Sequence, residues 1–269
     1  MAHVTVNYYI THEESISLEE LEKQTQQMKL HIFPTHQEQS TFAAEQIINT
    51  VKEKPTAVLC LASGETPRLT YSTVVSLAKK QQVDFSHVHF VGLDEWVGIP
   101  STNAGSCYYF LNDTIFHSLE VDKNRIHIFD GLADDLSFEC KKMNEIITVL
   151  GGIDLILVGV GLNGHVGFNE PGVASNLYAH VADLDPITTQ VGQKYFTAAT
   201  NLTKGITLGL SHFMEARVAI IVANGNKKAA IVKNALELEV STQIPASIIR
   251  NHKNGMIVLD SEAGSQLRH

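Results

Sequence analysis

The sequence predicts an α/β protein, with a single-domain doubly wound, mainly parallel sheet and helices on both faces, in the Rossmann-like class. Three observations lead to this prediction. Short runs of continuous apolar residues recur along the chain, as is typical of strands buried on both faces. Segments with helical apolar spacing separate these runs, and no repeat or linker interrupts the alternation. A length of 269 residues fits one such domain.

The first regular helix and strand follow a polar N-terminal segment. Residues 1–35 show a mixed pattern, and we interpret them as an N-terminal extension of unknown role before a domain of residues 36–269. The apolar residues of the first helix share one face, namely Ala44, Ile47, Ile48 and Val51. Lys54 and Pro55 end this helix, and the apolar residues 57–62 then predict a buried strand.

The same alternation continues to the end of the chain. Apolar spacing predicts further helices over residues 71–78, 106–119, 136–150 and 228–236. Continuous apolar runs predict further strands at residues 88–93, 153–158, 218–223 and 256–259. Ligands of such sheets bind beyond the carboxyl ends of the strands, so we expect the chemistry in the loops that follow strands.

Composition excludes several classes of protein. Lys+Arg of 20 and Asp+Glu of 29 give a formal net charge of −9, which argues against non-specific nucleic-acid binding. It does not argue against a phosphorylated small molecule, because a few local cations and N–H groups can hold one phosphate. The three cysteines form no C-x-x-C pair and indicate reduced thiols. With no apolar run long enough for a bilayer and no secretory-signal pattern, we expect a cytoplasmic protein without a membrane partner.

The first loop of interest, residues 63–67, lies between a buried strand and a helix. Gly64 lets the backbone approach a ligand closely, Ser63 and Thr66 supply hydroxyl groups, and free N–H groups at a helix start favour an anion. An ordinary helix-capping turn explains the same residues equally well. The loop lacks the Gly-Lys-Ser/Thr ending of a Walker A motif.

The second loop places two carboxylates side by side after a strand. Asp94 and Glu95 should point in opposite directions, so only one of them should face a cleft. The neighbouring Trp96 is the only tryptophan in the chain, and partial desolvation near it would raise the pKa of a carboxylate and suit a proton-transfer base. A capping acid beside a core tryptophan is the alternative.

The third loop, residues 159–172, contains five glycines, one histidine and one glutamate. Its first three glycines match G-x-G-x-x-G, but the loop is not in the first strand–helix unit and no apolar-periodic helix follows it, which argues against a dinucleotide site. A lone histidine is more often structural than catalytic. Here the glycines can present His165 and Glu170 for acid–base work. No second His or Cys lies nearby to complete a zinc site.

Together these loops resemble the glucosamine-6-phosphate deaminase/isomerase family. The matching stretches are LASGETP (61–67), LDEWVGIP (93–100) and GVGLNGHVGFNEPG (159–172), and the resemblance covers roughly residues 40–260. It implies conversion of an amino-sugar 6-phosphate to a ketose 6-phosphate and ammonia. It implies no metal or organic cofactor, and a small-molecule amino-sugar phosphate as the partner. The oligomeric state stays open, with a homo-oligomer among the options.

The resemblance also implies roles for individual residues. The substrate and its phosphate would be bound by Ser63, Gly64, Glu65, Thr66, Gly159, Lys194 and Lys228. Asp94 would move a proton between C2 and C1 of the sugar. His165 would open the pyranose ring, oriented by Asn163 and Glu170.

Three positions depart from the common family pattern. Asn163 and Lys194 stand where many members have Asp and Arg, and Trp96 stands where Tyr is more usual. The combination of Trp96 and Lys194, together with GITLGL (205–210) and VSTQIPAS (240–247), looks closer to the galactosamine-6-phosphate branch. The resemblance therefore leans to galactosamine 6-phosphate and tagatose 6-phosphate, rather than glucosamine 6-phosphate and fructose 6-phosphate.

Two other functions compete with a deaminase. A 6-phosphogluconolactonase has a similar fold and glycine–histidine loop, but needs neither a C2 base nor the glutamate after the histidine. A non-enzymatic sugar-phosphate-sensing domain would carry a basic helix-turn-helix, and residues 1–40 are too short and too poor in Lys and Arg for one.

Overall fold

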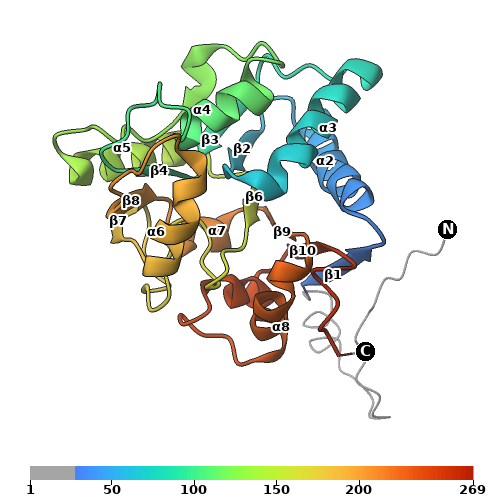
Figure 1. Ribbon diagram of the computed structural model, residues 1–269. Helices are drawn as coiled ribbons and strands as arrows, with labels where there is room; N and C mark the ends of the chain where they lie inside the picture. Colours follow the sequence, from blue (N-terminus) through green and yellow to red (C-terminus); the bar gives the residue numbers. More distant parts are fainter. Residues whose placement is uncertain (1–27, 269) are drawn as a thin grey trace, which may run out of the picture.

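A computed structural model describes residues 28–268 of the chain. Its centre is a seven-stranded sheet in which every neighbouring pair is parallel (Figure 1). From one edge to the other the strands are β1 (Lys29–Phe33), β10 (Gly255–Asp260), β9 (Val218–Ala223), β6 (Leu155–Gly159), β2 (Val58–Leu61), β3 (His89–Gly92) and β5 (Ile126–His127). The predicted parallel α/β sheet is confirmed.

Helices cover both faces of this sheet. The α-helices are α2 (His36–Glu53), α3 (Glu65–Gln81), α4 (Cys107–Leu111), α5 (Leu136–Val149), α6 (Pro186–Gly192), α7 (Leu210–Glu215) and α8 (Ala229–Glu237). Short 3-10 segments are η2 (Lys123–Arg125), η3 (Gln193–Tyr195), η4 (Asn226–Lys228) and η5 (Pro245–Asn251). The helix expected over residues 106–119 is instead α4 followed by one π-helical turn, η1 (Asn112–Phe116).

The alternation of side chains along each strand explains why both faces need cover. In β2, Leu59 and Leu61 join a core with α2 and α3, whereas Val58 and Cys60 join a second core with α5, α7 and α8. All four side chains are buried. Because successive strand residues point to opposite faces, a continuous apolar run requires helices on both sides. No helix in residues 28–268 is long and apolar enough to cross a membrane.

The sheet begins earlier in the chain than the sequence pattern indicated. Residues Lys29–Phe33 pair in parallel with β10 as the edge strand β1, although they lie in the segment that we treated as an extension. Four of the five residues in this strand are not fully buried, because an edge strand has only one neighbour. The rest of that proposed extension, residues 1–27, lies outside the described residues.

A second, smaller sheet was not predicted. Its antiparallel strands are β4 (Asp94–Trp96), β8 (Lys204–Thr207) and β7 (His180–Asp183). Strand β4 directly follows β3, so the small sheet begins at the carboxyl end of that strand of the large sheet. Asp94, the first residue of β4, is paired with Thr207 of β8. Asp94 therefore has a strand backbone rather than a loop backbone, which fixes the direction of its side chain.

The strand order places a topological switch point between β2 and β6. From β2 the chain proceeds to β3 and β5, whereas from β6 it proceeds to β9 and β10 on the other side. The loops that follow β2 and β6 therefore diverge and leave a crevice at their carboxyl ends. Crevices of this kind are the usual ligand sites of open α/β sheets.

Candidate active site

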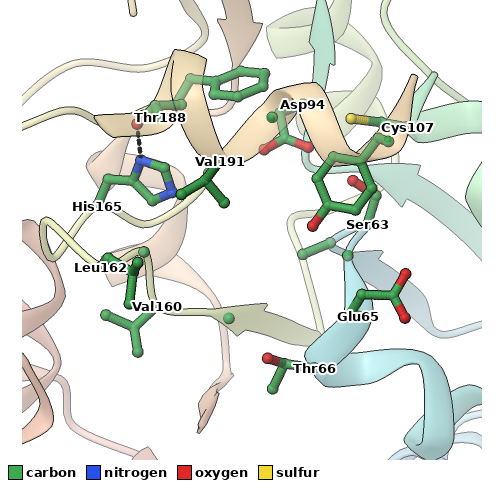
Figure 2. A pocket seen from close by; sticks show the side chains of 18 of the residues that line it. Ser63, Glu65, Thr66, Asp94, Cys107, Val160, Leu162, His165, Thr188 and Val191 are labelled. Carbon is green, nitrogen blue, oxygen red and sulfur yellow. Dashed lines mark hydrogen bonds between the residues drawn. The ribbon is translucent and has the colours of Figure 1, made fainter. Parts of the chain in front are cut away.

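A pocket occupies the crevice at the switch point. It is lined by the loop after β2, by β4, by the loop after β6, and by the α6–η3 segment (Figure 2). Of the residues singled out from the sequence, the pocket wall includes Ser63, Gly64, Glu65, Thr66, Asp94, Gly159, Asn163, His165, Lys194 and Lys228. Glu170 lies behind this wall, bonded to His165.

One end of the pocket is built to receive an anion. Helix α3 begins after Gly64, which has a φ of 120° that an L side chain rarely adopts, and within residues 28–268 no N-cap side chain bonds the start of the helix. The Glu65 N–H group faces the Tyr195 hydroxyl, and the N–H groups that follow lie at the positive end of the helix dipole. The Glu65 carboxylate is turned to Arg68, 3.1 Å away, so this residue presents its backbone rather than its charge.

Two lysines approach the same end of the pocket. Nζ of Lys228 donates to the carbonyl of Val160 at 2.6 Å, and Nζ of Lys194 lies 4.8 Å from the centre of the Tyr195 ring. Within residues 28–268 neither lysine has a carboxylate partner. Burial, and then the charge of Lys194, lower the pKa of Lys228 to about 8. An anion bound here would offset both effects, because a nearby negative charge favours the charged form of the lysine.

Asp94 lies deeper in the pocket, on the β4 side. The residue is half-buried and lines the pocket, and desolvation by the surrounding protein raises the pKa of its carboxyl group to about 7. A hydrogen bond from the Cys107 thiol opposes this shift, and the charge of Glu95 adds to it. Figure 2 shows Asp94, Cys107 and Ser63 close together on this side. A carboxylate with a pKa near neutrality is suited to exchange a proton with a carbon acid.

Glu95 points away from the pocket, as the alternation of strand side chains predicts. Its two oxygens accept four hydrogen bonds, from the Trp96, Cys107 and Tyr108 backbone N–H groups and from the Ser106 hydroxyl, at 2.7–3.1 Å. Three of these donors belong to the start of α4. Glu95 therefore attaches α4 to β4 and holds Cys107 beside Asp94.

His165 lies on the opposite side, in a network of polar side chains. Its Nδ1 is 3.0 Å from Glu170 Oε2 and 2.9 Å from Thr188 Oγ1. Asn163 Nδ2 donates to the same Glu170 oxygen at 2.8 Å, a bond that an aspartate could not make. Burial alone would raise the pKa of Glu170, but hydrogen bonds from His165, Thr188 and Asn163 lower it below its usual value.

The glycine at 161 allows the histidine to occupy this place. A Cβ on Gly161 would overlap the His165 imidazole and would lie 2.7 Å from Asn163 Oδ1. In contrast, a Cβ on Gly159 would meet no atom of residues 28–268 within 4 Å, because that position opens on the pocket. Gly161 therefore makes room for the His165 ring to pack, whereas Gly159 leaves the pocket open to a ligand.

Sequence patterns did not indicate three polar residues of the pocket, Cys107, Thr188 and Tyr195. Each stands outside the matched motifs, on α4, α6 or η3. No periodic or spacing signal in the sequence could have found them. Across the described part of the chain, no group of three or more His, Cys, Asp or Glu side chains could hold a metal ion.

Comparison with known proteins agrees with this architecture. The model of the family "Glucosamine-6-phosphate isomerases/6-phosphogluconolactonase" matches residues 35–258. A glucosamine-6-phosphate deaminase of Thermoanaerobacter sp. (strain X514) is 36% identical over 88% of this chain and 94% of its own length. One of Clostridium perfringens is 34% identical, over 90% of this chain and 100% of its own.

Two solved structures show the same fold. A monomeric glucosamine-6-phosphate deaminase superposes with a TM-score of 0.86 at 34% identity, covering 89% of this chain and 100% of that one. A 6-phosphogluconolactonase from Trypanosoma brucei has a TM-score of 0.69 at 20% identity, covering 89% and 98%. At that identity the lactonase shows a shared fold and no more.

Fold and comparisons together define the chain as an α/β enzyme. More particularly, it belongs to the glucosamine-6-phosphate isomerase/6-phosphogluconolactonase family, and the resemblance drawn from its three loops is confirmed.

Proposed function

We propose that this enzyme deaminates and isomerises an amino-sugar 6-phosphate, giving a ketose 6-phosphate and ammonia. The observation that carries the proposal is the arrangement of one pocket. The proposed anion-binding end, with the start of α3 and two lysines that have no carboxylate partner within residues 28–268, faces Asp94 and His165 on separate walls. The deaminases named above, at 34–36% identity over nearly all of the chain, support the same chemistry.

The phosphate group would occupy the lysine end. Backbone N–H groups of the Ser63–Thr66 turn and the two ammonium groups supply charge-assisted hydrogen bonds, which are roughly twice as strong as neutral ones. Fixing the substrate at this distant group leaves the sugar carbons near Asp94 and His165, so its binding energy orients the reacting atoms.

The chemistry would begin at His165. Its imidazole takes the proton of the C1 hydroxyl and returns one to the ring oxygen, so that the C1–O5 bond breaks and an open-chain aldehyde forms. Asp94 then removes the C2 proton while the substrate's ammonium group gives a proton to O1, which forms an enolamine, and Asp94 delivers its proton to C1. The resulting C2 imine adds water and releases ammonia, leaving the ketone. Asp94 ends in its initial ionised state, so the cycle closes without an external reductant or oxidant.

Within this class we propose galactosamine 6-phosphate as the preferred substrate. The support is the combination of Trp96 and Lys194 with the stretches at 205–210 and 240–247. Glucosamine 6-phosphate is the second candidate, because the relatives described above are named for it. The two sugars differ only in the configuration at C4.

A single assay tests both levels of the proposal. Ammonia release is measured with the two hexosamine 6-phosphates, with the free hexosamines, and with 6-phosphogluconolactone hydrolysis as a separate arm. We expect release from a 6-phosphate, a loss of efficiency of at least 10²-fold without the phosphate, and the higher kcat/KM with the galacto epimer. Lactone hydrolysis without ammonia release would refute the deaminase, and a preference for the gluco epimer would refute only the finer assignment.

A further inference from the structure

Thr188 is a buried polar residue in the second position after the Pro186 that opens α6. Its side chain is only 4% exposed, and it projects toward His165 (Figure 2). Asp185 caps the helix by accepting from the Ile187 N–H group at 2.7 Å, so the backbone at this point is held in place. No motif in the sequence assigned a role to Thr188.

The hydroxyl of Thr188 lies between all three members of the histidine network. Oγ1 is 2.9 Å from His165 Nδ1 and accepts from Asn163 Nδ2 at 3.3 Å. The hydroxyl also faces the Glu170 carboxylate and is one of the groups that lower the pKa of that carboxyl group. It is therefore the one group of α6 that joins this helix to the acid–base side of the pocket by hydrogen bonds among the described residues.

Accounting for the protons leaves one consistent arrangement. An ionised carboxylate has no proton to give, so His165 Nδ1 must carry the hydrogen of its 3.0 Å bond to Glu170. Oγ1 of Thr188 can then accept from Nδ1 and from Asn163, which leaves its own proton to point toward Glu170. A bare Nδ1 would instead set its lone pair against the carboxylate.

We propose that Thr188 is a positioning residue that holds His165 as the Nδ1–H tautomer, with the lone pair of Nε2 available to the substrate. Use of that lone pair in ring opening rests on the proposed function. The geometry on the other edge of the ring agrees, because Nε2 lies against Gly161, a pocket-lining residue without a side chain. Within residues 28–268 no protein group is hydrogen-bonded to Nε2.

A purely space-filling role for Thr188 predicts something different. Valine has nearly the same shape as threonine and would fill the space, but it can neither accept from Nδ1 nor donate to Glu170. Serine lacks the methyl group and keeps both hydrogen bonds. The pair Thr188→Val and Thr188→Ser therefore separates the hydroxyl from the volume.

The direct measurement is the ¹⁵N spectrum of the His165 ring in the full-length enzyme, assigned by comparison with His165→Gln. We expect Nδ1–H in the wild type, the same tautomer in Thr188→Ser, and a mixture of tautomers in Thr188→Val. Wild-type protein showing Nε2–H would overturn the proposal even if no variant could be folded. Thermal unfolding of each variant checks that it is folded before the spectra are compared.

Turnover provides a second readout. We expect Thr188→Val to lower kcat by about tenfold on a pyranose substrate, the effect of one hydrogen bond to a charged network, with KM little changed. Thr188→Ser should stay within about twofold of the wild type by the same reasoning. Equal impairment of the two variants, or an unimpaired Thr188→Val, would overturn the proposal. If the wild type released no ammonia, the proposed function would fail while the spectra still tested Thr188.

Discussion

The two walls of the pocket surround their ionisable side chains, Asp94 and His165, in opposite ways. The Asp94 wall (Asp94, Trp96 and Cys107) is mainly apolar around the carboxylate, with the centres of the Trp96 and Phe168 rings 4.6 Å apart and one weak sulfur donor near Asp94. The His165 wall (Asn163, His165, Glu170 and Thr188) is a network in which each polar side chain bonds another at 2.8–3.3 Å. The Asp94 wall offers its carboxylate few hydrogen bonds, whereas the His165 wall hydrogen-bonds its imidazole to several side chains.

This difference agrees with the roles that we propose for Asp94 and His165. A carboxylate that must take a proton from carbon gains basicity when it loses solvation, as the raised pKa of Asp94 shows. An imidazole has adequate basicity already, and it needs a defined tautomer and orientation. In this pocket, desolvation therefore raises the basicity of Asp94, and hydrogen bonds fix the tautomer and orientation of His165.

The largest effect should follow from removal of the proposed base on the Asp94 wall. Asp94→Asn preserves the shape but cannot accept the C2 proton, so kcat should fall by on the order of 10²–10⁴, the usual contribution of a positioned base. Ammonia release measures this loss. Binding of a non-reactive, phosphorylated open-chain analogue should be nearly unchanged, because the phosphate contacts lie at the other end of the pocket.

Glu95→Gln is the matched control, one residue along the same strand. Its side chain faces four donors rather than the substrate, so an amide there leaves at least one donor without an acceptor. We expect a loss in the free energy of unfolding of about 1–3 kcal/mol, and a kcat far closer to wild type than that of Asp94→Asn. Near-normal turnover in Asp94→Asn with loss in Glu95→Gln would show that the base has been misassigned.

A smaller and more selective effect is expected on the polar wall. His165→Gln should lower kcat/KM on a pyranose substrate by about 10²-fold, within the range of general acid–base catalysis. An open-chain analogue bypasses ring opening and should lose much less. Both substrates are compared in the same assay. Equal losses would place His165 in a step after ring opening and would remove the functional contrast between the walls.

The sequence located much of this site because each motif follows a continuous apolar run. The runs at 57–62 and 153–158 are strands in the parallel sheet, so the residues after them had to meet at its carboxyl edge. Local alternation was also enough to predict that Asp94 and Glu95 diverge. These inferences depend only on the periods of strand and helix, which are properties of short segments.

Residues outside such segments could not be found in this way. The edge strand Lys29–Phe33 has only one neighbouring strand, so burial leaves a weak pattern in its sequence. Strands β7 and β8 have four residues each, too few to show an alternation. Thr188 and Cys107 act through partners distant in the chain, so only tertiary packing brings them to the pocket.

The smallest expected effect concerns Cys107, whose thiol modifies the pKa of Asp94 on one of the two walls. Its thiol donates to the ionised Asp94 and so holds the carboxyl pKa below what burial alone would give. Cys107→Ala removes that donor and should raise the pKa of Asp94 above about 7. Cys107→Ser supplies a stronger O–H donor and should lower it, because a donor to the charged form stabilises that form.

The pH dependence of kcat/KM can separate these variants. Asp94 acts as a base only when ionised, so activity should fall as the pH drops through its folded-state pKa of about 7. The acid limb should move to higher pH in Cys107→Ala and to lower pH in Cys107→Ser. A thiol hydrogen bond is weak, so each displacement should be roughly 0.3–0.7 pH units, or a two- to fivefold change in rate on the limb.

On the plateau above the limb the three proteins should react at similar rates, since the base is then fully ionised in each. Coincident acid limbs would mean that the Cys107 thiol only fills space, and that desolvation alone sets the basicity of Asp94.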